Sequence, residues 1–151
     1  MTALEEFLLG WEEERLTPYR DAGGLWTVGV GHLMQPGDDT TQAITHDEAM
    51  ALFQTEVMDT QARVAPLVTW PIEQHHADAI CAFAFNVGIG AFAGSTMRRC
   101  INAGDLNAAA AEFERWSKAR VNGVLTVVPG LLKRRMAERQ IFVAGDYSGR
   151  P

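Results

Sequence analysis

Acidic side chains gather near the N-terminus in a pattern that suits cleavage of a glycosidic bond. Glu12, Glu13 and Glu14 follow a stretch with helical periodicity, and Asp21 follows a short segment with strand character. Hydrolysis of an acetal near neutral pH needs a carboxyl group that protonates the leaving oxygen and an ionised partner that assists attack at the anomeric carbon. Two carboxylates delivered by two different elements across a cleft would supply both roles.

Helical periodicity narrows the choice of the acid among the three glutamates. Apolar residues recur at i, i+3, i+4 and i+7, at Leu4, Phe7, Leu8 and Trp11. At about 100° per residue, Glu13 lies opposite this stripe, while Glu12 and Glu14 flank its two edges. A carboxyl group held in a partly apolar pocket has a raised pKa and keeps its proton. Periodicity therefore excludes Glu13 and leaves Glu12 and Glu14 open.

The ionised partner fits a hairpin that follows the glutamates. Thr17–Arg20 and Leu25–Val30 have the β-branched and aromatic residues of short strands, and Ala22–Gly24 between them has hairpin-turn chemistry. Asp21, in this polar turn, suits a carboxylate that positions a water and balances oxocarbenium charge. Thr27 on the facing strand offers a hydroxyl to hold that water.

These residues resemble the signature of the phage lysozyme (endolysin) family, glycoside hydrolase family 24. The matching residues are, in order, Glu12, Leu16, Tyr19, Asp21, Thr27, Gly29, Gly31, His32 and Leu33. Ala82–Gly88 looks like the family's phenylalanine-asparagine-valine-glycine motif. The C-terminal signature is similar at Ser95-Thr96, Trp116, Pro129–Leu131, Arg134-Arg135 and Glu138-Arg139. The resemblance covers nearly the whole chain, with one departure: Glu13 stands where the family usually has Gly after the catalytic Glu.

The resemblance implies an α+β, mostly helical fold of two lobes in a single lysozyme domain. A small β-hairpin lobe of about residues 13–65 would be joined by a long helix to a larger helical lobe of about residues 66–151, to which the first helix also belongs. It implies hydrolysis of the β-1,4 bond between N-acetylmuramic acid and N-acetylglucosamine in bacterial peptidoglycan. The water-holding pair favours inversion at the anomeric carbon.

The resemblance also assigns roles to residues. Among Glu12 and its neighbours it selects Glu12 as the acid, with Asp21 and Thr27 as its catalytic partners. Motif match makes Leu33, Phe85 and Asn86 candidates for the sugar-binding wall, although plain core packing explains Phe85 equally well. Arg134 and Arg135 could be a solvated helix start or a clamp on the peptide stems, and structural or peripheral roles are favoured for them.

Sequence signals outline the remaining elements. Thr2 with Glu5 and Thr45 with Glu48 have the spacing of capping boxes, so each pair predicts a helix start. Further segments are predicted as follows: a loop at Met34–Thr41, a long helix ending before Pro66, a break at Pro66–Pro71, helices at Ile72–Val87, from Ser95 to Gly104, from Asp105 to Trp116 and at Leu131–Val143, and an irregular loop with short extended pieces at Ser117–Val128.

No cofactor or metal is expected. The histidines are interpreted as structural at His32 and as surface residues at His46, His75 and His76, and no cluster of histidine, cysteine and carboxylate has ligand spacing. Cys81 and Cys100 lie in helical patterns and are predicted to be free thiols.

Charge distribution and hydropathy limit the classes of partner that the chain is expected to bind. Residues 1–75 carry 3 basic and 13 acidic side chains, whereas residues 76–151 carry 10 and 6, although the net charge is −6. The basic half is either a solvated surface or a face that meets the acidic peptides of a cell wall. No basic stripe interleaved with aromatic residues indicates nucleic acid, and no apolar run approaches the ~20 residues of a membrane span.

The family likeness also suggests a monomer that stays in the host cytoplasm until a holin opens the membrane, because the N-terminus lacks signal-peptide character. Two alternatives remain at this point. A lytic transglycosylase would cleave the same bond without water, and the Asp21–Thr27 pair argues against it. A catalytically silent glycan-binding module on the same fold is the other, and the retention of all three catalytic positions speaks against it.

Overall fold

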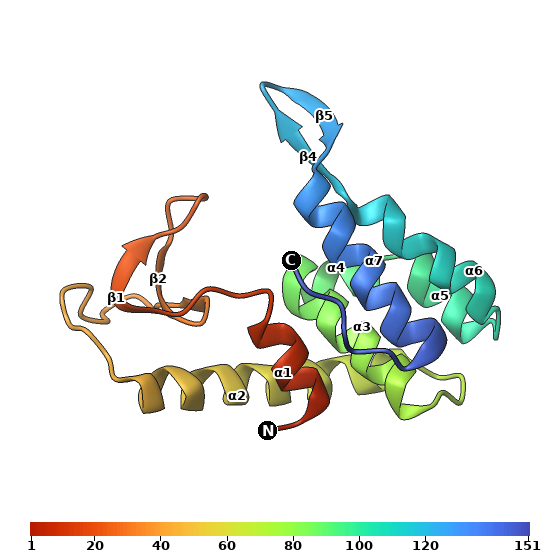
Figure 1. Ribbon diagram of the computed structural model, residues 1–151, viewed down its shortest axis with the longest axis horizontal. Coiled ribbons are helices and arrows are strands. Elements are labelled where there is room, and N and C mark those ends of the chain that lie inside the picture. Colours follow the sequence, from red (N-terminus) through yellow and green to blue (C-terminus); the bar gives the residue numbers. More distant parts are fainter.

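The computed structural model describes residues 1–151 and places a small antiparallel sheet after the first helix (Figure 1). Its strands are β1 (Arg15–Arg20), β2 (Trp26–Gly29) and β3 (His32–Leu33), hydrogen-bonded in the order β1-β2-β3. The register shifts between Arg15 and Tyr19, as at a β-bulge. The predicted hairpin is confirmed, and β3 extends it to three strands.

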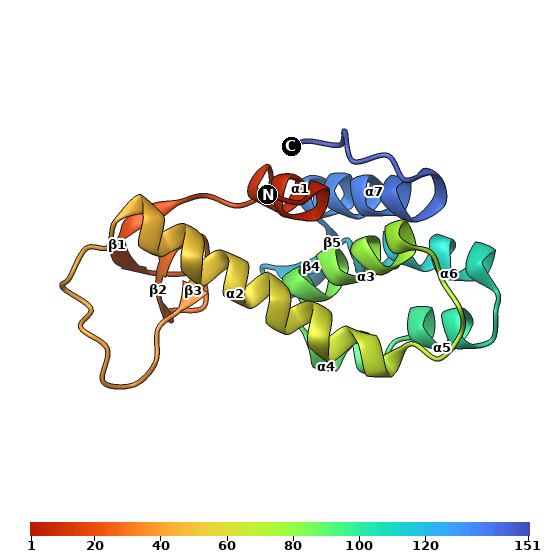
Figure 2. The same ribbon diagram turned by 90° about the horizontal axis from the view of Figure 1, so that it is seen from below.

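The helix α2 (His46–Val64) connects this sheet to the rest of the molecule, as both ribbon views show (Figures 1 and 2). Thr45 and Glu48 form the predicted capping box at its start. The sheet lies close against α2 at Gly29, where an added Cβ would come within 3.3 Å of the Ala49 Cβ. Gly29 also has φ +67, a conformation that favours glycine. Both facts explain the glycine at this strand end.

The helical lobe is built around α3 (Gln74–Val87), whose residues from Asp78 to Ala84 are all buried. The other helices are α1 (Ala3–Leu9), α4 (Ile89–Ala93), α5 (Thr96–Asn102), α6 (Leu106–Glu112) and α7 (Pro129–Ala144), with 3₁₀ turns at Ala65–Leu67 and Phe113–Trp116. Phe83 lies edge-on to the rings of Phe113 and Trp116, at centroid distances of 5.8 and 5.3 Å. Such edge-to-face packing stabilises aromatic cores beyond area burial. The fold is α+β, mostly helical and two-lobed, as predicted.

A second hairpin replaces the irregular loop that we predicted at Ser117–Val128. Strands β4 (Lys118–Val121) and β5 (Val124–Val127) pair in an unbroken antiparallel register. The turn residues Asn122 and Gly123 have φ +50 and +79, and positive φ at both positions is what a two-residue type I′ turn requires. This hairpin projects from the helical lobe beside the start of α7 (Figure 1).

Several expected features differ in position. α1 ends at Leu9, so the glutamates lie in the connection to β1 and not on a helix; the backbone N–H of Glu12 still bonds to the Leu8 carbonyl at 3.2 Å. The short helix α4 was not predicted. None of the helices combines the length and the apolar character that crossing a membrane would require.

The histidine predictions are partly wrong. His32 bonds through Nδ1 to Glu56 Oε1 at 2.6 Å, which confirms its structural role. His75 and His76 are half-buried and not surface residues, because their rings pack against each other and reach the Ile141 carbonyl and the Phe142 ring on α7. Cys81 and Cys100 are free, as predicted.

Candidate active site

Glu12 is the half-buried member of the glutamate run. Its side chain is 22% exposed, and its Oε1 accepts a hydrogen bond of 2.8 Å from Arg134 Nη1. A Cβ added at Gly31 would lie 4.0 Å from Glu12 Oε2, so the turn between β2 and β3 comes close to this carboxylate. Glu13 is exposed, and Glu14 bonds to the exposed His46 at 2.6 Å. The two glutamates that periodicity left open therefore have different surroundings.

Asp21 organises the turn of the first hairpin. Its Oδ1 accepts two backbone hydrogen bonds of 2.9 Å, from the N–H groups of Gly23 and Leu25. These bonds fix the carboxylate to the backbone and use only one of its oxygens. The second oxygen, Oδ2, makes no hydrogen bond within the protein, so it is available to a water or a substrate.

The register of the sheet brings three candidate residues to one face. Tyr19 pairs with Thr27, and Thr27 in turn pairs with Leu33 on β3. Directly paired residues share a face. Asp21 directly follows β1, and its backbone N–H bonds to the Leu25 carbonyl at 2.9 Å, so the pairing continues one residue further and puts Asp21 on the side of Tyr19. Thr27 is 4% exposed, and its hydroxyl donates to the Leu25 carbonyl at 3.1 Å. Its oxygen keeps its acceptor capacity.

The two candidates on α3 differ from each other. Phe85 is half-buried, and its ring lies edge-on to Phe53 of α2 at a centroid distance of 5.9 Å, so packing in the core explains at least part of the burial of this ring. Asn86 is exposed, and its Oδ1 accepts a hydrogen bond from Arg135 Nη2. Of the two, Asn86 carries the polar side chain and is exposed to solvent.

A buried ion network on α7 supports the site. Arg134, Arg135 and Glu138 are at most 6% exposed, and Glu138 Oε1 lies 3.3 Å from Arg134 Nε while its Oε2 lies 3.1 Å from Arg135 Nε. Burial raises the pKa of Glu138 to about 7, against the opposing influence of Arg135 and Arg134. Both arginines are buried, which excludes the solvated helix start considered for them.

Sequence reasoning missed the contact between Arg134 and Glu12. The signal was the helical stripe of α7, which continues upstream from Ile141 and Phe142. Arg134 and Glu138 precede Ile141 by seven and three residues, so they share its buried face. Buried charges on a core face require partners, and Glu12 is one of them.

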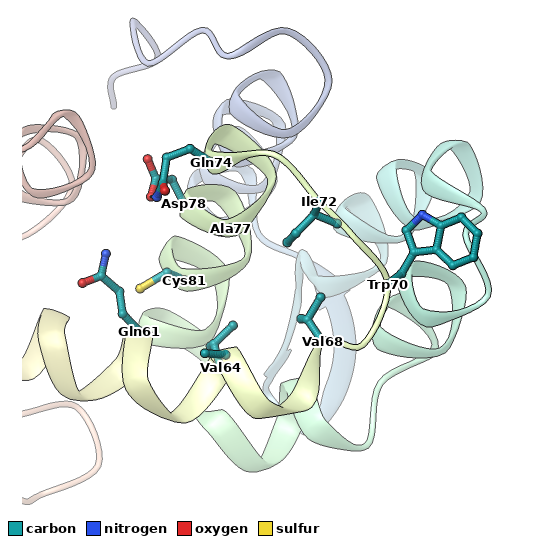
Figure 3. Close-up of a pocket in the computed structure, with 10 residues that line it drawn as sticks. Gln61, Val64, Val68, Trp70, Ile72, Gln74, Ala77, Asp78 and Cys81 are labelled. Atoms are coloured by element: carbon teal, nitrogen blue, oxygen red, sulfur yellow. The ribbon is translucent and has the colours of Figure 1, made fainter.

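A separate cavity of about 280 Å³ lies elsewhere, between the end of α2, the connection to α3 and α3 itself (Figure 3). Apolar residues such as Val64, Val68 and Ile72 line it together with Cys81 and Asp78. Burial raises the pKa of the Cys81 thiol to about 12, so it stays protonated and is a poor nucleophile. Neither Glu12 nor Asp21 lines this cavity, and no group of three potential metal ligands occurs in the structure.

Comparison with known proteins decides the family. The model of the phage lysozyme family matches residues 10–138. The chain belongs to the phage lysozyme family. The endolysin of Acyrthosiphon pisum secondary endosymbiont phage 1 is 40% identical over 87% of this chain and 89% of that protein. The endolysin of Salmonella phage P22 is 35% identical over 88% and 90%, respectively.

A solved structure supports the same family assignment. The muramidase domain of SpmX from Asticaccaulis excentricus superposes with a TM-score of 0.86 at 30% identity, covering 95% of this chain and 97% of that domain. The protein is accordingly a lysozyme, a glycoside hydrolase that acts on peptidoglycan.

Proposed function

We propose that Glu12 is the general acid of this lysozyme and that Asp21 and Thr27 orient the attacking water. The bond cleaved is the β-1,4 linkage between N-acetylmuramic acid and N-acetylglucosamine. The observation that carries the proposal is the half-buried Glu12 beside a sheet that presents Asp21 and Thr27 on one face. Proton donation by a positioned side chain contributes about 10²–10⁴-fold to a rate.

The sugar-binding part of the proposal concerns three residues. Leu33 is 45% exposed and pairs with Thr27, so an apolar contact would lie next to the catalytic pair. Asn86 offers an exposed amide that suits the N-acetyl groups and hydroxyls of amino sugars. Phe85, half-buried between Phe53 and solvent, would form the wall behind that amide.

Glutamine variants of the three glutamates test the identity of the acid. Glu12→Gln keeps the size of the side chain and its bond to Arg134 but cannot release a proton, so wall lysis should fall by at least ~10²-fold. Glu13→Gln and Glu14→Gln are matched controls that should retain most activity, because both side chains are solvent-facing. A dead Glu14→Gln beside an active Glu12→Gln would overturn the assignment.

We further propose that the reaction inverts the anomeric carbon. A threonine hydroxyl beside the carboxylate is useful for holding a water, whereas a direct nucleophile has no need of it. The β-linked glycan would release an α-configured reducing sugar first. NMR of the earliest products reads the anomer before mutarotation; an initial β-anomer or a glycosyl ester trapped on Asp21 would exclude this course. A 1,6-anhydro product would indicate a lytic transglycosylase.

The biological role that we propose is lysis of the host cell by a monomeric, single-domain enzyme. It would remain in the host cytoplasm until a holin opens the inner membrane. Expression alone should then leave intact bacteria unlysed, and lysis should follow membrane permeabilisation within minutes. Rapid lysis without a permeabiliser would contradict the dependence on a holin, and a concentration-dependent sedimentation coefficient would contradict the monomer.

A further inference from the structure

We propose that Glu138 is a positioning residue for the active site: one buried carboxylate that holds Arg134 toward Glu12 and Arg135 toward Asn86. The proposal rests on the assignment of Glu12 as the general acid. It adds that one side chain, Glu138, positions both the acid Glu12 and the candidate sugar-binding amide Asn86, which come from different parts of the chain.

The geometry forms a continuous chain of contacts. Arg134 spans Glu12, at 2.8 Å from Nη1, and Glu138, at 3.3 Å from Nε. Arg135 spans Glu138, at 3.1 Å from Nε, and Asn86 through Nη2. Arg135 and Glu138 are fully buried, and the Arg135 guanidinium also lies 5.2 Å from the Phe83 ring centre. Side chains held this way have few alternative rotamers, so a change at Glu138 is transmitted to both ends.

Charge gives the network a second effect on the acid. Its charged members are two guanidinium groups and two carboxylates, Arg134 and Arg135 against Glu138 and Glu12, and these are the charged groups that face Glu138. Arg134 Nη1 places a positive charge 2.8 Å from Glu12 Oε1. Above about pH 7, where Glu138 is ionised, its negative charge offsets the positive charge that Arg134 presents to Glu12. Interactions among Arg134, Arg135 and Glu138 are only weakly screened because these three groups are buried.

The network leaves several buried polar atoms without a hydrogen bond. Arg134 Nη2, Arg135 Nη1 and Arg135 Nε lack a hydrogen-bond partner, and so does Glu138 Oε2, which lies 3.1 Å from Arg135 Nε and pairs with it by charge alone. Buried unpaired donors are costly, so loss of the Glu138 charge would turn both guanidinium groups more strongly toward their remaining acceptors. For Arg134 that acceptor is Glu12.

The test is the pH profile of kcat/KM on purified peptidoglycan with Glu138→Gln. The alkaline limb of the profile reports loss of the proton from the general acid. On the part of the limb above about pH 7, where Glu138 is ionised, removing its negative charge should move the limb to lower pH by about one unit. A side chain that only stabilises the fold would lower the rate at every pH and leave the limb in place.

A second variant gives a shift of opposite sign. Asn86→Asp adds a negative charge beside Arg135 at an exposed position, where folding tolerates it, and should move the limb to higher pH even if the rate falls. Arg139→Gln is the control, since Arg139 contacts the exposed Glu114 and not this network; its limb should coincide with that of the unmodified enzyme.

The possible outcomes distinguish failure of the role proposed for Glu138 from failure of the assignment of Glu12 as the acid. An unmoved or raised limb in Glu138→Gln overturns the positioning role, even where Glu12→Gln is inactive. Should Glu138→Gln fail to fold, the Asn86→Asp limb decides alone, and an unmoved limb there overturns it. An active Glu12→Gln would instead remove the assignment on which the proposal rests.

Discussion

Arg135 offers the sharpest test of how the buried charges contribute to stability. Its side chain is fully buried, and replacing it with methionine leaves Glu138, also fully buried, with Arg134 as its remaining cation. Breaking a buried pair by removing one partner costs about 3–5 kcal/mol. For a chain of about 150 residues, 1 kcal/mol corresponds to roughly 2–4 °C in Tm, so Arg135→Met should lower the Tm by roughly 6–20 °C.

Urea unfolding followed by far-UV circular dichroism measures this cost, with Arg139→Met as the matched control. Arg139 pairs with Glu114 at 2.9 Å, but both side chains are more than a third exposed, and such a surface pair contributes at most about 1 kcal/mol. The double variant Arg135→Met/Glu138→Leu removes both charges and should recover most of the loss. Equal costs for Arg135→Met and Arg139→Met, or a double variant no more stable than the single one, would refute the reasoning.

Three further outcomes follow from the structure. Thr27→Val should abolish most activity in a turbidity assay while changing the unfolding free energy by only about 1 kcal/mol, the value of one hydrogen bond, whereas Thr27→Ser keeps the hydroxyl and should keep the activity. Burial raises the pKa of Glu138 from 4.5 to about 7, so the folded state binds a proton at Glu138 more tightly than the unfolded state does. The contribution of this protonation to the free energy of unfolding should fall as pH rises from about 4.5 to 7. Urea midpoints at pH 5 and 7 measure that fall, and Glu138→Gln should flatten it. Binding to isolated cell walls should weaken as salt rises, because the half-chain of residues 76–151 is basic and exposed charges are screened beyond about 8 Å at physiological ionic strength; pull-down across a salt series checks it.

Local rules predicted most of the helix starts. Capping boxes place a side chain on a backbone N–H three residues away, so Thr2 and Thr45 mark helix starts without reference to the rest of the chain. The end of α1 was harder to predict. Helical periodicity continues through Trp11, but the backbone leaves the helix after Leu9 because the chain must turn toward β1. Periodicity cannot report such a tertiary requirement.

The second hairpin was missed although a local signal was present. Asn122-Gly123 is a strong signal for a two-residue hairpin turn, and Val124–Val127 after it is rich in β-branched residues, although Lys118–Val121 before it has only one. Most of the side chains on both faces of this hairpin are exposed, so the segment lacks the alternating burial by which strands are usually recognised. Turn chemistry was the better guide here.

Neighbours distant in sequence, and not the local pattern, distinguish the glutamates. Glu12 and Glu14 have the same chemistry and flank the same predicted stripe, yet one contacts a buried arginine 122 residues away and the other an exposed histidine 32 residues away. Glu13 is exposed, so a carboxylate in place of the family's usual glycine faces solvent. Arg134 places a buried positive charge beside Glu12, and the second carboxylate, Glu138, offsets that charge. The acid and its counter-charges therefore form one unit, and a substitution in any of them should be judged by the charge balance of the whole network.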